Sequence, residues 1–305
     1  MMSLRAWIYL LLLSSFWGAS FYFIEVGLEH LSPVWLVSLR LISGAICLCA
    51  WLTITSVSLP YQLAFWRDCL VMGVLNNLAP FCLIAWGQLS VTGGMASILN
   101  ANTAFIGVLV SALFLKTEPL RVNRVAGVII GVSGVAVAIG VNPLSGETGS
   151  VWGQLAIVLA TLFYALAGVW GRVRLSSYQA VQGACGMLLC SAVLSVPLAL
   201  LLSGQPSVSL LQSAHLGTLV VLILGIGLLG TAMAYPLYFK VLELAGASNL
   251  LLVTIIVPVF ALSLDALLLG QLVSWSAMAG FGLVAFGLSV MDGRLYHRKD
   301  SSDSR

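Results

Sequence analysis

Three ionisable side chains lie well inside long apolar runs of this 305-residue chain: Glu25, Arg40 and Asp265. A charge in apolar surroundings is costly, so such residues are retained where they pair with one another or serve a function. At a rise of about 1.5 Å per residue, all three lie within roughly 10 Å of one end of their runs. We expect Arg40 to pair with one of the acids as a gate, or to anchor a substrate carboxylate. A structural ion pair, or carboxylates that reach water, is the alternative.

A second group of candidates consists of amide, hydroxyl and aromatic side chains inside the apolar runs. Amides in hydrocarbon need hydrogen-bond partners, so they are expected to face the interior of a helix bundle. A cavity of aromatic and amide groups without a central charge would suit a neutral or zwitterionic solute with an apolar side chain. Ordinary packing between helices, or a place at the membrane interface, is the alternative. The candidates are Trp17, Phe21, Tyr22, Asn76, Asn77, Trp86, Asn100, Asn102, Thr103, Tyr164 and Tyr235.

The composition places all these residues in a membrane protein. Hydrophobic residues make up 60% of the chain and charged residues 8%, whereas soluble domains carry roughly 25% charged residues. A soluble domain and a nucleic-acid partner are therefore not expected, despite the net charge of +3. The six cysteines form no CxxC pair, which argues against a metal or redox site. We expect no metal and no cofactor.

A helix that crosses a bilayer needs about 20 apolar residues, and the chain contains ten such runs. Charges, prolines or Gly-Ser clusters separate them. The sequence therefore predicts an all-α integral membrane protein with ten transmembrane helices. The predicted spans are 6–28, 33–55, 66–88, 92–115, 121–140, 151–172, 178–202, 216–239, 247–269 and 274–291.

The basic residues predict the orientation of the spans, because short cytoplasmic loops retain Lys and Arg. If the N-terminus is cytoplasmic, every one of the 13 basic residues except Arg40 falls on the cytoplasmic side. Both termini are then cytoplasmic. The tail 292–305 is charged and rich in serine, so we expect it to be disordered.

The chain also repeats itself, with one set of residues recurring at a constant offset of 153 positions. Two five-span units are predicted, 1–141 and 151–291. Because five is odd, they must be inserted with opposite orientations, a recurrent design of secondary transporters. The residues Gly93, Leu99, Leu109, Leu115, Ala126, Gly127 and Gly134 recur as Gly246, Leu252, Leu262, Leu268, Ala279, Gly280 and Gly287.

Two stretches carry a family resemblance. The first is Phe16-Trp17-Gly18-Ala19-Ser20-Phe21, followed by Pro33 and Arg40. The second is Ala96-Ser97-Ile98-Leu99-Asn100, followed by Leu115-Lys116-Thr117-Glu118-Pro119 and by Gly127, Gly131 and Gly134. Over nearly its whole length the chain resembles the EamA family of the drug/metabolite transporter superfamily. The family pattern usually has an acidic residue at the junction of helices 9 and 10, where this chain has Gln271.

The resemblance implies a secondary transporter, often an exporter of amino acids or other small metabolites. It further implies that helices 1–4 and 6–9 line a central cavity, while helices 5 and 10 pack at the periphery. The expected partners are a small-molecule substrate and the lipid bilayer. The chain is expected to be a monomer or a homodimer and to lie in a bacterial inner membrane as a multi-pass protein.

Two other functions compete with metabolite export. The first is proton-coupled export of multidrug cations, which favours a carboxylate near the middle of the membrane. The second is an intramembrane enzyme or scaffold, but no acid–base or metal set is visible at one depth. The literal GxGxxG of Gly225–Gly230 lies in an apolar run without a preceding strand, so it does not indicate a nucleotide site. The GxxxG of Gly127–Gly131 indicates close helix approach, within one subunit or between two.

Overall fold

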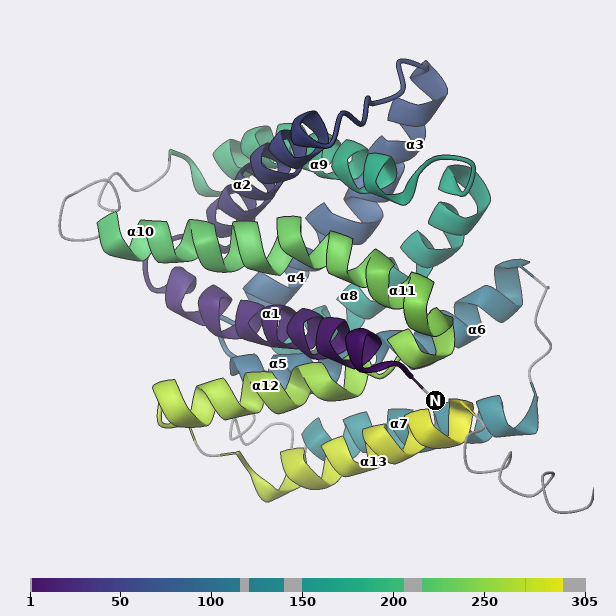
Figure 1. Ribbon diagram of the computed structural model, residues 1–305. Coiled ribbons are helices and arrows are strands. Elements are labelled where there is room, and N and C mark those ends of the chain that lie inside the picture. The colour runs from purple at the N-terminus through teal and green to yellow at the C-terminus, as the bar shows by residue number, and fades with distance from the viewer. Residues whose placement is uncertain (1, 116–120, 140–149, 206–215, 272, 293–305) are drawn as a thin grey trace, which may run out of the picture.

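The computed structural model describes residues 2–115, 121–139, 150–205, 216–271 and 273–292 (Figure 1). Every regular element in these residues is helical, and three π-helical segments interrupt the α-helices. The α-helices are α1 (Leu4–Leu28), α2 (Pro33–Ile54), α3 (Leu63–Gly73), α4 (Ala79–Gly87), α5 (Gly93–Asn100), α6 (Thr103–Leu115), α7 (Val122–Ile139), α8 (Val151–Trp170), α9 (Ala180–Ser203), α10 (Leu216–Leu222), α11 (Ala234–Leu250), α12 (Val253–Leu268) and α13 (Trp275–Asp292). The π-helical segments are Val74–Leu78, Gly171–Leu175 and Ile223–Met233.

Within the described residues, nine continuous helical stretches are long and apolar enough to cross a membrane. A tenth apolar helix, α12, has only 16 residues. The chain is therefore an all-α, multi-pass membrane protein, and its helices fall where the ten spans were predicted. The tail 293–305 lies outside the described residues, and the cytoplasmic placement of both termini stays a prediction.

The predicted boundaries fail where helices break or extend. The eighth span is longer than predicted and continues from Leu216 to Gly246, where the backbone turns with φ of 76°. The ninth span accordingly begins only at Val253, after a turn at Leu251–Leu252. The fourth span is interrupted in a similar way by a turn at Ala101–Asn102. Hydropathy alone does not detect such turns, because their residues are as apolar as those of the helices.

Helices α7 and α13 pack side by side at the edge of the bundle (Figure 1). A Cβ on Gly127 would lie 2.6 Å from the carbonyl oxygen of Gly287, and a Cβ on Gly134 would lie 2.8 Å from that of Gly280. Only glycine permits this approach of two backbones. The contacts run in opposite order along the two helices, which are therefore antiparallel. The GxxxG of Gly127–Gly131 thus joins two helices of the same chain.

The two halves of the chain use matching helix contacts. The first span packs on the ninth (α1 on α12), and the sixth packs on the fourth (α8 on α6). Likewise α2 packs on the π-helical segment Ile223–Met233, while α9 packs on α3. A two-fold relation between residues 1–141 and 151–291 would produce these pairings. The opposite insertion of the two halves stays a prediction.

Candidate functional site

A cavity of about 730 Å³ lies between the helices of the two halves. Spans 1–4 and 6–9 all contribute to its wall, and no residue of α7 or α13 does. This is the arrangement that the family resemblance implied. The volume falls within the range of roughly 300–1,000 Å³ that is usual for small-molecule sites.

Seven of the eleven predicted cavity residues lie on this wall: Trp17, Phe21, Asn76, Asn100, Thr103, Tyr164 and Tyr235. The other four lie elsewhere. Tyr22 contacts the Phe23 ring, with centroids 5.4 Å apart, and Trp86 is 48% exposed on the outside of the bundle. Asn77 and Asn102 are buried behind the wall. Adjacent helical residues point about 100° apart, so Asn76 faces the cavity while its neighbour Asn77 does not.

An amide and hydroxyl network supports one side of the wall. Asn76 Nδ2 donates to Tyr235 Oη at 3.3 Å and to Asn77 Oδ1 at 3.2 Å. Tyr235 Oη also donates to Asn77 Oδ1 at 3.1 Å, and Asn77 Nδ2 donates to Ser191 Oγ at 3.2 Å. These bonds join spans 3, 7 and 8. They give the amides of Asn76 and Asn77 the hydrogen-bond partners that buried amides need. Asn77 therefore holds Asn76 and Tyr235 in place at the wall.

Arg40 lies on the cavity wall although it is only 8% exposed. Its Nε donates to Thr231 Oγ1 at 3.0 Å, and its Nη2 donates to the carbonyl oxygen of Gly230 at 3.2 Å. The guanidinium carbon lies 3.9 Å from the centroid of the Phe81 ring. The wall therefore includes a buried charged residue, Arg40, in addition to the aromatic and amide groups. Helix α2 packs closely on the π-helical segment Ile223–Met233, and this contact places Arg40 at the cavity wall.

Neither acid named as a partner of Arg40 bonds to it in the described structure. Glu25 accepts from the backbone N–H of Gly93 at 2.9 Å and from the side-chain amide of Gln271. Asp265, which is 2% exposed, accepts from the backbone N–H of Gly94. Both carboxylates thus cap the first turn of α5, where the helix dipole favours negative charge. They tie α1 and α12 to α5, and their role as a gate stays a prediction.

Two corresponding contacts between the halves lie beside the cavity. We call them the charged corner and the neutral corner. Arg40 stands three residues before Ser43 in α2, and Leu188 stands three residues before Ser191 in α9. Each serine packs on a glycine of the opposite half, and the residues three and four positions after that glycine complete the corner. The charged corner is Arg40, Ser43, Gly227, Gly230 and Thr231; the neutral corner is Leu188, Ser191, Gly73, Asn76 and Asn77.

Both corners lie on π-helical segments. Asn76 and Asn77 belong to Val74–Leu78, while Gly230 and Thr231 belong to Ile223–Met233. Such segments are rare and occur frequently at functional sites, because the wider turn frees carbonyl groups and redirects side chains. Pro80 and Pro236 stand two and three residues after these segments and lack the N–H that a regular helix would need there. Hydropathy gives no signal for a π-helical turn.

The cavity opens at the end where α8 leads into α9. The lining residues Arg172, Ser176 and Gln179 are exposed there, whereas Phe21, Ile24 and Ile84 are buried at the other end. Gln88 Nε2 donates to the carbonyl oxygen of Phe21 at 2.9 Å and helps to close that end. The open end is the predicted cytoplasmic side. Arg40 therefore lies toward the closed end, and Arg172 lies at the mouth.

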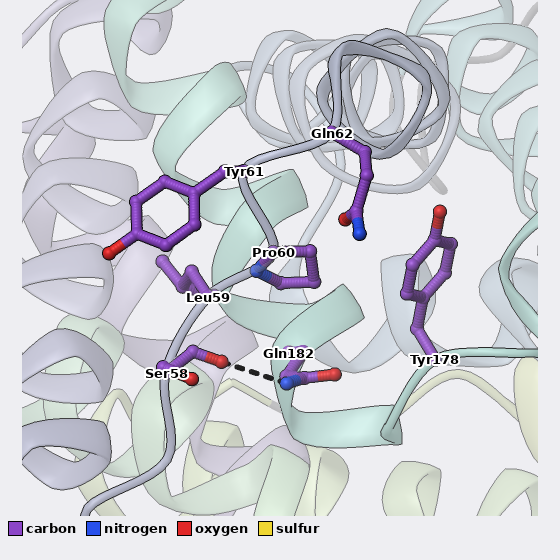
Figure 2. A pocket seen from close by; sticks show the side chains of 7 residues that line it. All are labelled: Ser58, Leu59, Pro60, Tyr61, Gln62, Tyr178 and Gln182. Atoms are coloured by element: carbon purple, nitrogen blue, oxygen red, sulfur yellow. Dashed lines mark hydrogen bonds between the residues drawn. The ribbon is translucent and has the colours of Figure 1, made fainter.

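A second pocket of about 550 Å³ adjoins the mouth (Figure 2). The segment 58–62, Tyr178 and Gln182 form it, and Tyr178 also lines the large cavity. Figure 2 shows the Gln182 amide bonded to the carbonyl oxygen of Ser58, at 2.8 Å. Tyr61 is 95% exposed and points away from Tyr178 (Figure 2). The pocket is a hollow between a loop and a helix end, outside the bundle of spans.

Sequence reasoning missed one buried acid. Asp68 is 5% exposed and bonds to Arg67 at 3.2 Å and to Arg174 at 3.3 Å. Its backbone carbonyl oxygen also accepts from Trp170 Nε1 at 3.0 Å. The third span begins at Leu63 and not at 66, so Asp68 lies in the second turn of the helix and not in the first. The sequence did contain a signal. Asp68 follows Arg67, and both Arg67 and Arg174 were predicted to lie on the cytoplasmic side.

Comparison with known proteins places this architecture in a family. The model of the EamA-like transporter family matches residues 4–140 and again residues 151–291. This chain belongs to the EamA-like transporter family. Among the described residues no group of three or more His, Cys, Asp or Glu side chains is placed to hold a metal ion. Gly225–Gly230 is continuous helix, so the strand and turn of a nucleotide site do not occur there.

Relatives of this EamA-like chain are distant but match at nearly full length. It is 25% identical to the uncharacterized transporter YoaV of Bacillus subtilis, covering 89% of this chain and 91% of YoaV. It is 24% identical to a protein of Salmonella typhimurium named as a probable amino-acid metabolite efflux pump, covering 90% of each. It is also 24% identical to the uncharacterized inner membrane transporter YedA of Escherichia coli, covering 89% of this chain and 85% of YedA.

One solved crystal structure supports the fold of this EamA-like chain. The superposition covers 97% of this chain and 99% of the chain in that structure, with a TM-score of 0.67 at 19% sequence identity.

Proposed function

We propose that this chain is a secondary transporter that exports or exchanges a small metabolite by alternating access. The substrate is an amino acid or a similar neutral or zwitterionic solute with an apolar part. The cell membrane is the site of action, the inner membrane in a bacterium with two membranes. The two five-span units are inserted with opposite orientations and move relative to each other around the cavity.

The cavity carries this proposal. It lies between the two halves, opens at one end and is closed at the other, where Gln88 bonds to Phe21 within the first half and Gly94 bonds to Asp265 of the second half. A site reached from one side at a time is what alternating access requires. Its wall combines aromatic rings with amide and hydroxyl groups, which suits a solute with one apolar and one polar part.

The charge of the wall disfavours export of lipophilic cations. Arg40 and Arg172 line the cavity, and no Asp or Glu is among its described lining residues. A cation exporter needs a carboxylate that holds either the cation or a proton. The outer carboxylates Glu25 and Asp265 are instead held by backbone and side-chain amides away from the cavity.

Counterflow in proteoliposomes tests the proposal, with a panel of neutral and aromatic amino acids, purines, sugars and lipophilic cations. Accumulation of an amino acid or another neutral metabolite is expected. Accumulation of cations alone, or no accumulation with correctly folded protein, would contradict it.

A matched pair of glycine variants shows whether transport uses the cavity. A Cβ at Gly168, on the cavity wall, meets no atom within 4 Å, and the same holds for Gly282, which is exposed on α13. Gly168→Trp fills the cavity without a backbone clash, so we expect counterflow to fall by about tenfold or more. Gly282→Trp adds the same side chain at the periphery and is expected to retain transport.

A further inference from the structure

Arg40 is a buried cation whose bonding capacity is largely unused. A guanidinium group has five N–H donors, and among the described residues two of them find acceptors: Nε at Thr231 and one N–H of Nη2 at Gly230. Both acceptors are uncharged. Phe81 covers one face of the guanidinium, at 3.9 Å from the ring centroid. The remaining donors belong to a side chain that lines the cavity.

The described protein supplies no counter-charge for this cation. Among the described residues, Asp68 pairs with Arg67 and Arg174, and Glu243 pairs with Lys240. Glu25 and Asp265 bond elsewhere, to Gln271 and to the start of α5. A buried charge without a partner is strongly unfavourable, so its retention at a cavity wall indicates a ligand that supplies the opposite charge.

The surroundings of Arg40 select the type of anion. A guanidinium group fixed at Nε presents its other N–H groups as a planar fork, which matches the two oxygens of a carboxylate. Arg40 is the single basic residue toward the closed end of the cavity, because the other lining arginine, Arg172, lies at the mouth. Its immediate neighbours are the ring of Phe81 and the hydroxyl of Thr231. One cation in this setting balances a monoanion and does not balance a phosphate ester.

We propose that Arg40 forms a carboxylate-binding subsite toward the closed end of the cavity, and that the transported solute carries a carboxylate. This proposal rests on the proposed transport function and specifies its substrate class. The aromatic residues of the wall contact the apolar part of the solute.

Binding to purified protein tests the subsite without requiring transport. Isothermal titration calorimetry in detergent compares L-phenylalanine with L-phenylalaninamide, and benzoate with benzamide, with inorganic phosphate as a separate probe. We expect each carboxylate to bind the native protein about tenfold or more tightly than its amide. Equal affinities, no binding by any of these probes, or tighter binding of phosphate would overturn the proposal.

Variants assign the preference to Arg40. Arg40→Gln is expected to bind the carboxylate and the amide of each pair equally, while its affinity for the amides stays within about twofold of the native value. Arg40→Lys retains the charge without the fork, so a reduced preference for carboxylates should remain. It also keeps the test available if Arg40→Gln does not fold. Lys240→Gln removes an exposed positive charge outside the cavity and serves as the control. An undiminished preference in a folded Arg40→Gln protein would assign the anion to another residue.

The binding and counterflow results fail in different ways. Carboxylate binding that depends on Arg40, together with no counterflow, would refute the transport function and keep the subsite. Counterflow of an uncharged solute that is unaffected by Arg40→Gln would support the transport function and refute the subsite.

Discussion

The charged corner and the neutral corner share one packing plan and differ in their polar chemistry. In each, a serine of span 2 or 7 lies against a glycine of span 8 or 3. At the charged corner, Arg40 bonds to Thr231 and Gly230 and faces the cavity with unused donors. At the neutral corner the position of Arg40 is taken by Leu188, which is fully buried, and Asn76 and Asn77 bond to Tyr235 and Ser191. The difference indicates that one corner is built for a ligand and the other is satisfied by the protein itself.

The shared glycines provide the largest test of this comparison. A Cβ at Gly73 would lie 2.7 Å from both Ser191 Oγ and the carbonyl oxygen of Met187, and a Cβ at Gly227 would overlap the side chain of Ser43. Gly73→Leu and Gly227→Leu should each force the helices apart, at a cost of about 3 kcal/mol or more. Size-exclusion chromatography in detergent should therefore show a loss of monodisperse protein for both variants.

Gly217→Leu is the control, because a Cβ there meets no atom within 4 Å. If only one of the two corner variants misfolded, the corners would not share the packing plan inferred here.

The polar residues that follow the two glycines should separate stability from selectivity. Asn77→Leu removes the partner of Ser191, Tyr235 and Asn76, so we expect the free energy of unfolding to fall by about 1–3 kcal/mol. Thr231→Val removes one acceptor from Arg40, so we expect a smaller loss of stability, about 1 kcal/mol, and weaker carboxylate binding. Thermal unfolding and calorimetry measure the two quantities. A loss of selectivity in Asn77→Leu alone would reverse the assignment of roles.

The two serines should show the smallest contrast. Ser191 Oγ accepts from Asn77 of the opposite half and has two carbonyl acceptors within reach, Met187 in its own helix and Gly73 in the opposite half, so Ser191→Ala is expected to lower the free energy of unfolding by about 1 kcal/mol. Ser43 Oγ bonds only to carbonyl groups of its own helix, so Ser43→Ala should change it by less than about 0.5 kcal/mol. Equal changes in thermal unfolding would show that the polar chemistry of the corners is less different than their bonds indicate.

Much of the fold was predictable because lipid imposes a simple rule. A span must be apolar and helical, and its length is set by the bilayer, so ten apolar runs indicated ten spans. The GxxxG of Gly127–Gly131 indicated close helix approach, because close backbone contact demands small residues, but its partner α13 became known only from the structure. The amides on the cavity wall were selected because such a side chain inside an apolar helix needs a hydrogen-bond partner away from lipid, and the aromatic residues were expected to line the cavity with them.

The partners of the charged residues were not predictable from depth along a helix. Glu25, Arg40 and Asp265 lie at similar depths, yet the acids bond to α5 while Arg40 bonds to the π-helical segment Ile223–Met233. Which side chains meet depends on the rotation of each helix and on its neighbours. A π-helical turn changes that rotation without changing hydropathy.

The sequence by itself therefore determined the class of protein, the number of spans and the small residues at close contacts, because these follow from the solvent and from local geometry. Only the tertiary structure decided that Arg40 faces a cavity without an acid beside it. That outcome depends on the packing of helices far apart in the chain, since Arg40 and Thr231 are separated by 191 positions.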